Sequence, residues 1–281
     1  MSELSDHLDS LAALAHGDGG WGYAKGQPGH LEPTCLALLA LSAEAPRFGA
    51  VIDAAKAWLR QCACPDGTYR LARGRPEAVW PTALVLFVQA SLGYPVEEVD
   101  RTAAALVGRQ GRQTAEAGGE EVNDIDLKLV GWPWAENTFS WVEPTAWACL
   151  ALRRAGQGAH PRVRVGQELL LDRALEEGGV NYGNRRIFGV SLEAIPGPTA
   201  LMLLALQGRP LDPRVTAAVE FLRRQVEQSV DLEHLCWARL ALDSYSNLPG
   251  AAESLLGLDG RIHEAHAARA ETPWVQPAPL R

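Results

Sequence analysis

Glu143 is the carboxylate in this sequence that is best placed to act as an acid. It stands in the segment WVEPTAW, with Trp141 two residues before it and Trp147 four residues after it. A carboxyl group among indoles loses hydration, which raises its pKa and keeps a proton available for transfer. Glu32 has the same place in a similar segment, and both residues could instead complement the positive N-terminal end of a helix. Two roles are therefore open for Glu143, a proton donor and the more ordinary helix cap.

Asp124 and Asp126 are two further acidic residues, two positions apart in the stretch NDID. The ordinary interpretation is that both are solvated loop side chains. They lie in the Gly-rich, acidic segment from Gly111 to Ser140, and long loops in compact domains are often lids or binding loops. We expect this segment to flank the mouth of a cavity.

Tryptophans are concentrated around Glu143. Indole faces attract cations and provide large apolar surfaces, so Trp80, Trp134, Trp141 and Trp147 are candidate ligand-binding residues. The alternative is that tryptophans fasten turns onto helices. That structural role is the better interpretation for Trp132 and for the aromatic residues at the same place in the other copies of the repeat described below.

Metal signals are weak in this sequence. The chain has five cysteines, an odd number that does not favour a disulfide framework. Cys62 and Cys64 form a lone C-x-C pair without a second ligand pair at zinc-site spacing. We expect no metal site and no cofactor.

The sequence contains four copies of one repeat, and these copies contain the aromatic candidates and Glu143. Each has a Gly-rich turn, an aromatic residue, a spacer and an X-Pro-Thr sequence that opens an apolar run. Trp21, Tyr69 and Trp132 each precede the proline by 12 positions. Tyr182 precedes Pro198 by 16 positions, which predicts a four-residue insertion in the fourth copy.

Each apolar run is expected to be a helix, since Ala and Leu dominate it and proline suits the first helical turn. A helix that is apolar all round must be covered on every side. The stretches between the runs are amphipathic, so each of them can cover an apolar helix with one face and meet solvent with the other. These stretches are Glu3–Ala15, Arg47–Cys62, Glu97–Arg109, Pro161–Glu177, Asp212–Gln228 and Ala251–Ala270. We predict an all-α fold of about five to six helical hairpins, either a closed ring or an open solenoid. Residues 1–270 would form a single domain and residues 271–281 an irregular, Pro-rich tail.

Composition narrows the possible partners. The formal charge of −8 argues against a nucleic-acid ligand, because phosphate neutralisation needs clustered Lys and Arg. No run approaches the roughly 20 uninterrupted apolar residues of a membrane helix. The acidic opening MSELSDHLDSLAALA does not resemble a secretory signal, so a cytoplasmic protein is expected.

The turn, aromatic, spacer and helix pattern resembles the repeat shared by squalene cyclases and the β-subunits of protein prenyltransferases. The resemblance covers about residues 16–246, and its most specific stretch is GWPWAENTFSWVEPTAWACLAL. It implies an α/α toroid, a double ring of helices around a central apolar cavity. It also implies an apolar, isoprenoid ligand.

Three chemistries are known on that scaffold, and none of their motifs is complete here. The D-x-D-D motif of terpene cyclases, whose chemistry needs one carboxyl group held protonated among its neighbours, is absent. Its nearest approach, NDID, is followed by Leu127, and the resemblance makes Asp124 and Asp126 candidate catalytic acids. Prenyltransferases hold zinc with an Asp, a Cys and a His, and His234 in the segment DLEHLCW stands at the His position. The positions of the Asp and Cys ligands are occupied by Gly197 and Thr199, which cannot replace them. His234 thus remains a candidate ligand-binding residue or a hydrogen-bonded histidine at a helix start. The thioester sequence of complement-type toroids is also absent.

The sequence therefore predicts a toroid that binds an apolar small molecule, with the reaction undetermined. The alternatives are a non-catalytic binding scaffold and a partner subunit of a heteromeric complex, whose contact would be another protein.

Overall fold

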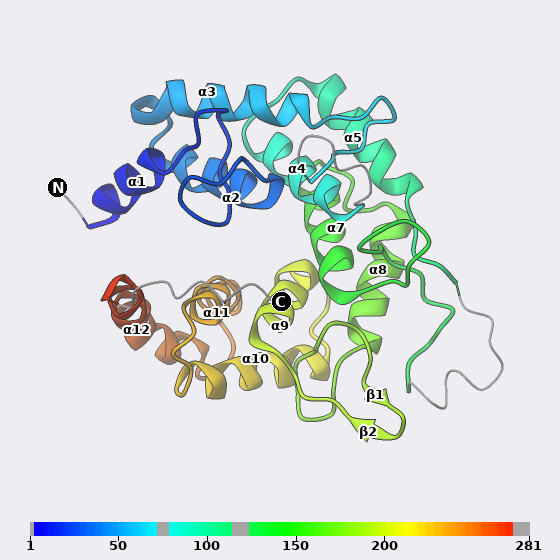
Figure 1. Cartoon of the computed structure of the whole chain (residues 1–281). Helices are drawn as coiled ribbons and strands as arrows, with labels where there is room; N and C mark the ends of the chain where they lie inside the picture. The colour runs from blue at the N-terminus through cyan, green and yellow to red at the C-terminus, as the bar shows by residue number, and fades with distance from the viewer. Residues whose placement is uncertain (1–2, 72–78, 114–123, 272–281) are drawn as a thin grey trace, which may run out of the picture. The chain divides into compact units, whose positions relative to one another are not determined.

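The computed structural model describes residues 3–71, 79–113 and 124–271. Their regular structure is helical, apart from one two-stranded antiparallel hairpin (Figure 1). The predicted all-α fold class is confirmed. The last helix ends at Glu271, and the expected irregular tail beyond it lies outside the described residues.

The helices alternate between two kinds. The apolar helices are α2 (Leu31–Leu41), α4 (Trp80–Ser91), α7 (Val142–Arg154), α9 (Pro196–Leu206) and the less apolar α11 (Leu232–Ser244). The amphipathic helices are α1 (Glu3–Ala13), α3 (Ala45–Gln61), α5 (Val96–Gly108), α8 (Pro161–Asp172), α10 (Pro213–Val226) and α12 (Ala251–Glu271). A short 3-10 helix, η1 (Ser42–Glu44), joins α2 to α3, and the hairpin consists of β1 (Arg186–Ile187) and β2 (Val190–Ser191).

Burial follows the predicted division. In α9 every residue from Pro196 to Leu203 is buried. In α3 the buried residues Phe48, Ile52 and Ala55 recur at helical spacing, so only one stripe faces the interior. The apolar helix α9 is therefore covered and the amphipathic helix α3 is half-exposed, as the sequence predicts.

The chain divides into two compact units, and the boundary falls within α8. In unit 1, which holds the described residues of 1–117 and 126–169, α4 packs against both α2 and α7 (Figure 1). The amphipathic helices α3 and α5 pack on α2 and α4. In unit 2, which holds residues 124–125 and 170–271 of the described part, α11 packs against α9, α10 and α12. The single domain expected from the sequence stays a prediction.

A threonine clamp fixes each turn to the apolar helix that follows it. Thr34, Thr82 and Thr145 each accept a hydrogen bond, through the side-chain oxygen, from the main-chain N–H of the residue 13 positions earlier, at 2.9–3.0 Å. The donors are Trp21, Tyr69 and Trp132, the three aromatic residues of the predicted register. The hydroxyl oxygen thus provides a hydrogen-bond acceptor for a buried main-chain N–H that lies in a turn, outside any helix or sheet.

The fourth copy differs from its predicted register. Thr199 accepts from the N–H of Val180, 19 positions earlier, and Tyr182 is exposed. The insertion relative to the other copies is therefore six residues (19 − 13) rather than four. It lies in the segment that forms the β1–β2 hairpin, so Tyr182 is part of the inserted loop and not the repeat aromatic.

Two repeat tryptophans also fasten their turns to the preceding amphipathic helix. The indole N–H of Trp21 donates to the carbonyl of Leu11 in α1 at 2.8 Å. That of Trp132 donates to the carbonyl of Leu106 in α5 at 2.7 Å. The structural role expected for these tryptophans is thus the observed one.

One stretch, Leu31–Gln61, passes a test of length and composition for a membrane-crossing helix. It is broken, because α2 ends at Leu41 and the backbone within α3 is non-helical at Phe48 (φ −109°, ψ 17°). Neither α2, with 11 residues, nor α3, with 17, has the roughly 20 apolar residues that a span needs. The expected lack of a membrane span and the cytoplasmic location stay predictions.

Candidate functional site

The start of α4 carries the first aromatic pair. Trp80, the first residue of α4, meets Trp134 edge to face, with ring centroids 5.3 Å apart and 77° between the ring planes. The main-chain N–H of Val79 donates to the carbonyl of Trp134 at 3.0 Å, so the turn of the third copy is tied to this helix start. Both indoles are half-buried. Two of the predicted ligand-binding residues therefore form one surface.

A second aromatic pair lies further along the same two copies. Trp147 of α7 meets Phe87 of α4 with centroids 5.9 Å apart and 72° between the planes. Ser91 and Arg154, four and seven residues further along their helices, are joined by a hydrogen bond of 3.1 Å. The two contacts show that α4 and α7 run side by side in the same direction. We call Trp80, Phe87, Trp134 and Trp147 the aromatic face.

Glu143 lies four residues before Trp147 on α7, so the two side chains share one side of that helix. It is half-buried in the first helical turn, where a carboxylate complements the positive end of the helix. The structure thus places Glu143 next to the aromatic face along α7. Its position fits the helix cap and the acid equally well.

The first copy of the repeat provides an internal comparison for Glu143. The equivalent carboxylate, Glu32, accepts a short hydrogen bond from the hydroxyl of Tyr23. Burial and this carboxylate raise the pKa of Tyr23 above its usual value, so the phenol keeps its proton. Two residues after the repeat aromatic, where the first copy has Tyr23, the third copy has Trp134. Glu143 thus belongs to a copy in which an indole replaces the phenol.

Trp141 has a position that recurs in the repeats. It is the N-cap residue of α7, with extended backbone, and its main-chain N–H donates to the carbonyl of Trp132 at 3.1 Å. His30 and Ile195 are the N-cap residues of α2 and α9 and make the corresponding main-chain bond. The backbone of Trp141 is thus structural, whereas its half-buried side chain stays a predicted ligand contact.

The two loop aspartates are divided between the units. Asp124 belongs to unit 2, where it forms an ion pair with Arg185 at 3.0 Å and has a positive φ of 53°. Asp126 belongs to unit 1 and accepts a hydrogen bond from the N–H of Lys128 at 2.8 Å. Each carboxylate has a structural partner. The described part of the long loop also closes on itself, because the N–H of Arg112 donates to the carbonyl of Thr138 at 2.7 Å.

His234 lies in unit 2, in the first turn of α11. Its main-chain N–H donates to the N-cap side chain of Asp231 at 3.1 Å, and its imidazole is partly exposed. It is not part of the aromatic face, which unit 1 forms alone. Among the described residues, no group of three or more His, Cys, Asp or Glu could hold a metal ion.

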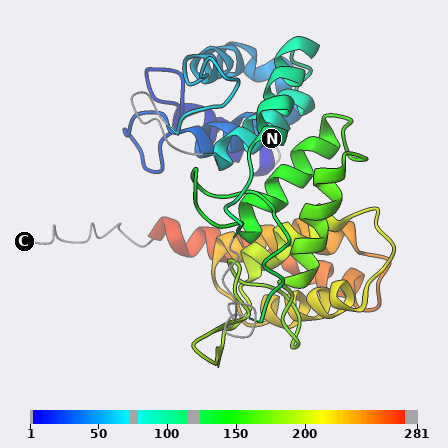
Figure 2. The ribbon, with the colours of Figure 1, turned by 90° about the vertical axis from the view of Figure 1, so that its right-hand side faces the viewer.

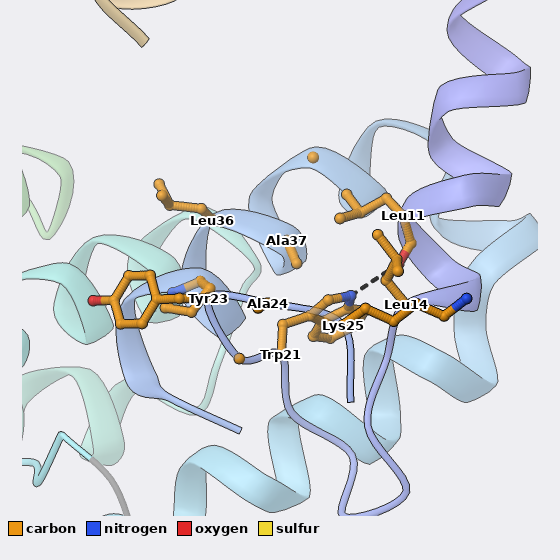
Figure 3. Close-up of a pocket in the computed structure, with 11 residues that line it drawn as sticks. Leu11, Leu14, Trp21, Tyr23, Ala24, Lys25, Leu36 and Ala37 are labelled. Atoms are coloured by element: carbon orange, nitrogen blue, oxygen red, sulfur yellow. Dashed lines mark hydrogen bonds between the residues drawn. The ribbon is translucent and has the colours of Figure 1, made fainter. Parts of the chain in front are cut away.

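An apolar pocket of about 430 Å³ lies beside the first copy of the repeat, entirely within unit 1 (Figure 3). Its walls come from the end of α1, the turn from Trp21 to Lys25 and one side of α2. No sequence motif predicts this pocket, because most of its walls are leucines and alanines from three separate segments. No motif singles out Phe87 either, because it lies in an unbroken apolar run. Each becomes visible only when equivalent positions of the four copies are compared.

No model of a known protein family matches this chain. Over 85 residues, or 30% of its length, the chain is 41% identical to drimenyl diphosphate synthase of Streptomyces showdoensis, and that match covers 15% of the synthase. The solved structure of type II terpene cyclase MstE from Scytonema superimposes with a TM-score of 0.57 at 21% identity, covering 79% of this chain and 62% of MstE. A protein from Actinoplanes gives a TM-score of 0.54 at 22% identity, covering 78% and 63% of the two chains.

The fold is similar to that of a type II terpene cyclase. The all-α toroid class implied by the family resemblance is thus supported by solved structures as well as by the helices. The chain spans less than two thirds of the length of these proteins. A variant of MstE has also been solved with geranylgeranyl dihydroxybenzoate, named as its substrate, at a TM-score of 0.52 and 18% identity over 76% of this chain.

Proposed function

We propose that this chain is a terpene cyclase-like toroid that binds an acyclic isoprenoid against the aromatic face. The proposal is supported by the isoprenoid ligands of the similar structures and by the match to drimenyl diphosphate synthase. It is also supported by the chemistry of the face, since indole and phenyl surfaces bind apolar chains and attract cations.

One observation carries the proposal. Three residues after the repeat proline, the first, second and fourth copies all have leucine, whereas the third copy has Trp147. The fold thus accepts leucine at this position, so the indole of Trp147, which is 8% exposed and packs on Phe87, adds more aromatic surface than the repeat requires. A large π surface on an apolar helix, paired with Phe87, suits a hydrocarbon ligand and any positive charge that develops on it.

We further propose Glu143 as the proton donor for that ligand. In this step the carboxyl O–H bond breaks and its proton forms a new C–H bond with the π electrons of an alkene. The positive charge left on the neighbouring carbon would lie against the indoles, and the loss of a proton from carbon to Glu143 would restore the carboxyl group. The support is the position of Glu143 on the same side of α7 as Trp147.

The experiment compares Trp147→Leu with the wild-type protein, because leucine is the residue of the other copies and should preserve the fold. Calorimetric titration with geranylgeranyl diphosphate should show about tenfold weaker binding for the variant, the loss expected when a large apolar π surface is removed. Phe139→Leu is the matched control, since Phe139 is an exposed aromatic residue of the same copy. Its affinity should equal that of the wild type.

Incubation with squalene, farnesyl diphosphate and geranylgeranyl diphosphate, followed by product analysis, tests the reaction. A cyclised product that disappears in Glu143→Gln would support the acid role, and product formation unchanged in that variant would exclude it. If neither affinity nor product depends on Trp147, the proposed function is wrong.

A further inference from the structure

The first copy of the repeat leaves open a helix stripe that the other three copies bury. Leu36 stands three residues after Pro33 and is 38% exposed, whereas the corresponding residues are 0%, 8% and 3% exposed. Ala40, four residues further along α2, is exposed as well, and its counterparts are all buried. The counterparts of the two positions are Leu84 and Val88, Trp147 and Ala151, and Leu201 and Ala205.

The other copies show how this stripe is normally covered. In α7 the stripe residue Trp147 packs on Phe87, which belongs to the apolar helix of the preceding copy. Among the described residues, no apolar helix precedes α2, and the amphipathic helix α1 stands on that side. What remains is a concave space rather than a flat helix face.

That space is the pocket of about 430 Å³, within the size range of roughly 300–1,000 Å³ typical of small-molecule sites. Figure 3 shows Leu11 of α1 and Leu14, just beyond the end of α1, on one side and Leu36 and Ala37 of α2 on the other, with the turn around Trp21 below them. These walls are apolar. Because α1 already occupies one side, the space suits a hydrocarbon chain better than a second helix.

The floor of the pocket is rigid. Trp21 is held by three hydrogen bonds: its N–H to Thr34, its carbonyl from the N–H of His30 and its indole N–H to Leu11, at 2.7–2.9 Å. A Cβ atom on the next residue, Gly22, would lie 2.7 Å from the side chain of Gln27, so only glycine fits the turn. The pocket is therefore preformed by the fold.

The turn that lines the pocket carries two polar side chains besides the indole of Trp21. Tyr23 and Lys25 both line it, and Figure 3 shows the hydroxyl and the amine pointing in opposite directions. Tyr23 is engaged with Glu32, whereas Lys25 is exposed and carries a positive charge at the mouth. A ligand with an apolar chain in the pocket would thus meet a cation where its head group emerges.

We propose that this pocket is a second binding site, for the hydrocarbon chain of an isoprenoid whose anionic head group pairs with Lys25. It rests on the proposed function for the choice of an isoprenoid, but it lies on α1 and α2 and shares no residue with the aromatic face. The chain could therefore hold two hydrocarbon segments, one at each place in unit 1.

The test uses the full chain and two probes, farnesyl diphosphate and neutral farnesol, in calorimetric titrations. Leu36→Trp fills the pocket from an exposed position and should weaken or remove one of two binding events for both probes by at least about tenfold. Leu240→Trp, at an exposed leucine of α11, is the matched control and should change nothing. Lys25→Gln should weaken farnesyl diphosphate binding several-fold and leave farnesol unaffected.

The outcomes separate this inference from the proposed function. If Leu36→Trp binds both probes like the wild type while Trp147→Leu loses affinity, the pocket is not a site and the aromatic face still is. The opposite result would keep the pocket and reject the face. If Leu36→Gln and Leu36→Trp instead dissociate an oligomer in analytical ultracentrifugation, the pocket is a protein interface and the proposal is overturned. Circular dichroism and melting curves of each variant verify that it is folded.

Discussion

The main-chain N–H of Trp132 donates to the hydroxyl oxygen of Thr145 at 3.0 Å, across 13 residues of sequence. The bond joins the Gly-rich turn of the third copy to the first turn of α7, which carries Glu143 and Trp147. Gly131 makes the close approach possible, because a Cβ atom there would lie 2.3 Å from the same oxygen. The geometry of the candidate site thus depends on one buried hydroxyl group.

Thr145→Val should therefore destabilise the protein by about 1–3 kcal/mol, the cost of leaving a buried N–H without an acceptor. Valine keeps the shape of threonine, so packing contributes little to this loss. Thr145→Ser keeps the hydroxyl and is the matched control. Urea unfolding measures both variants, and a Thr145→Val protein as stable as the wild type would show that the hydrogen bond contributes nothing.

Arg162 holds the same turn from the opposite side. Its guanidinium donates to the carbonyls of Val130 and Arg109 at 2.9 and 2.7 Å and stands 4.3 Å from the ring centre of Trp132. The helices α7 and α8 lie together here (the green pair in Figure 2), with the Cys149 sulfur 3.7 Å from the carbonyl of Val163.

Arg162→Lys should lose about 2–3 kcal/mol of stability, because an ammonium group cannot form the forked contacts of a guanidinium. Arg164→Lys, at an exposed position of the same helix, should be neutral within about 0.5 kcal/mol. The measurement is the denaturant midpoint of each variant. A midpoint for Arg162→Lys equal to that of the wild type would contradict the bracing role of Arg162.

The β1–β2 hairpin contains a strained residue. Phe188 has a positive φ of 50°, is followed by Gly189 at 79°, and its side chain is 90% exposed. Asparagine followed by glycine is the preferred pair for a two-residue hairpin turn in which both residues have positive φ. Phe188→Asn should thus stabilise the protein by about 0.5–1 kcal/mol, since no packing is lost.

Thermal unfolding provides the measurement for this hairpin. Ile187→Asn changes the neighbouring residue, which has no positive φ, and should bring no gain. A lower melting temperature for Phe188→Asn would show that the exposed ring makes a stabilising contact.

The stability of the fold depends on pH through the carboxylate of Asp212. Its pKa is lowered from 3.8 to about 2, mainly by the hydrogen bond from the side chain of Arg214. The main-chain N–H of Arg214 lowers it further. Since the folded-state value lies below the unfolded one, ionised Asp212 stabilises the fold at neutral pH. This contribution is lost as the pH falls from about 4 to about 2.

Asp212→Asn keeps a helix-capping oxygen but removes the charge. The free energies of unfolding of the two proteins should differ at pH 7 and converge near pH 2. A difference that stays constant over this range would mean that the carboxylate charge makes no contribution.

The repeat was predictable wherever short-range chemistry defines it. The spacing from Trp132 to Pro144 gave the turn and the helix start, and the threonine clamp explains why this spacing is kept. The sequence pattern places the start of the fourth copy at Tyr182, because Tyr182 is aromatic and Val180, the residue that the clamp holds, is not. A better signal was the Gly-Gly pair before Val180, which matches the Gly-Gly pair before Trp21.

The candidate site was only partly predictable. The sequence predicts Trp80 and Trp134 as two separate candidates, and their contact depends on packing between two copies of the repeat. Asp124 and Asp126 look like a pair in the sequence, yet a positive φ at Asp124 and its ion pair with Arg185, 61 residues away, assign them to different units. Sequence proximity could not show this, because long-range partners decide it.

Photo-crosslinking tests the central claim most directly. A farnesyl or geranylgeranyl diphosphate analogue that carries a diazirine on its hydrocarbon chain would be bound to the full chain, irradiated, and the labelled peptides identified by mass spectrometry. The account predicts labels in α4 and α7, within Trp80–Ser91 and Val142–Arg154, that excess unlabelled isoprenoid suppresses and Trp147→Leu reduces. Labels confined to other helices, or labels that competitor does not suppress, would contradict isoprenoid binding at the aromatic face.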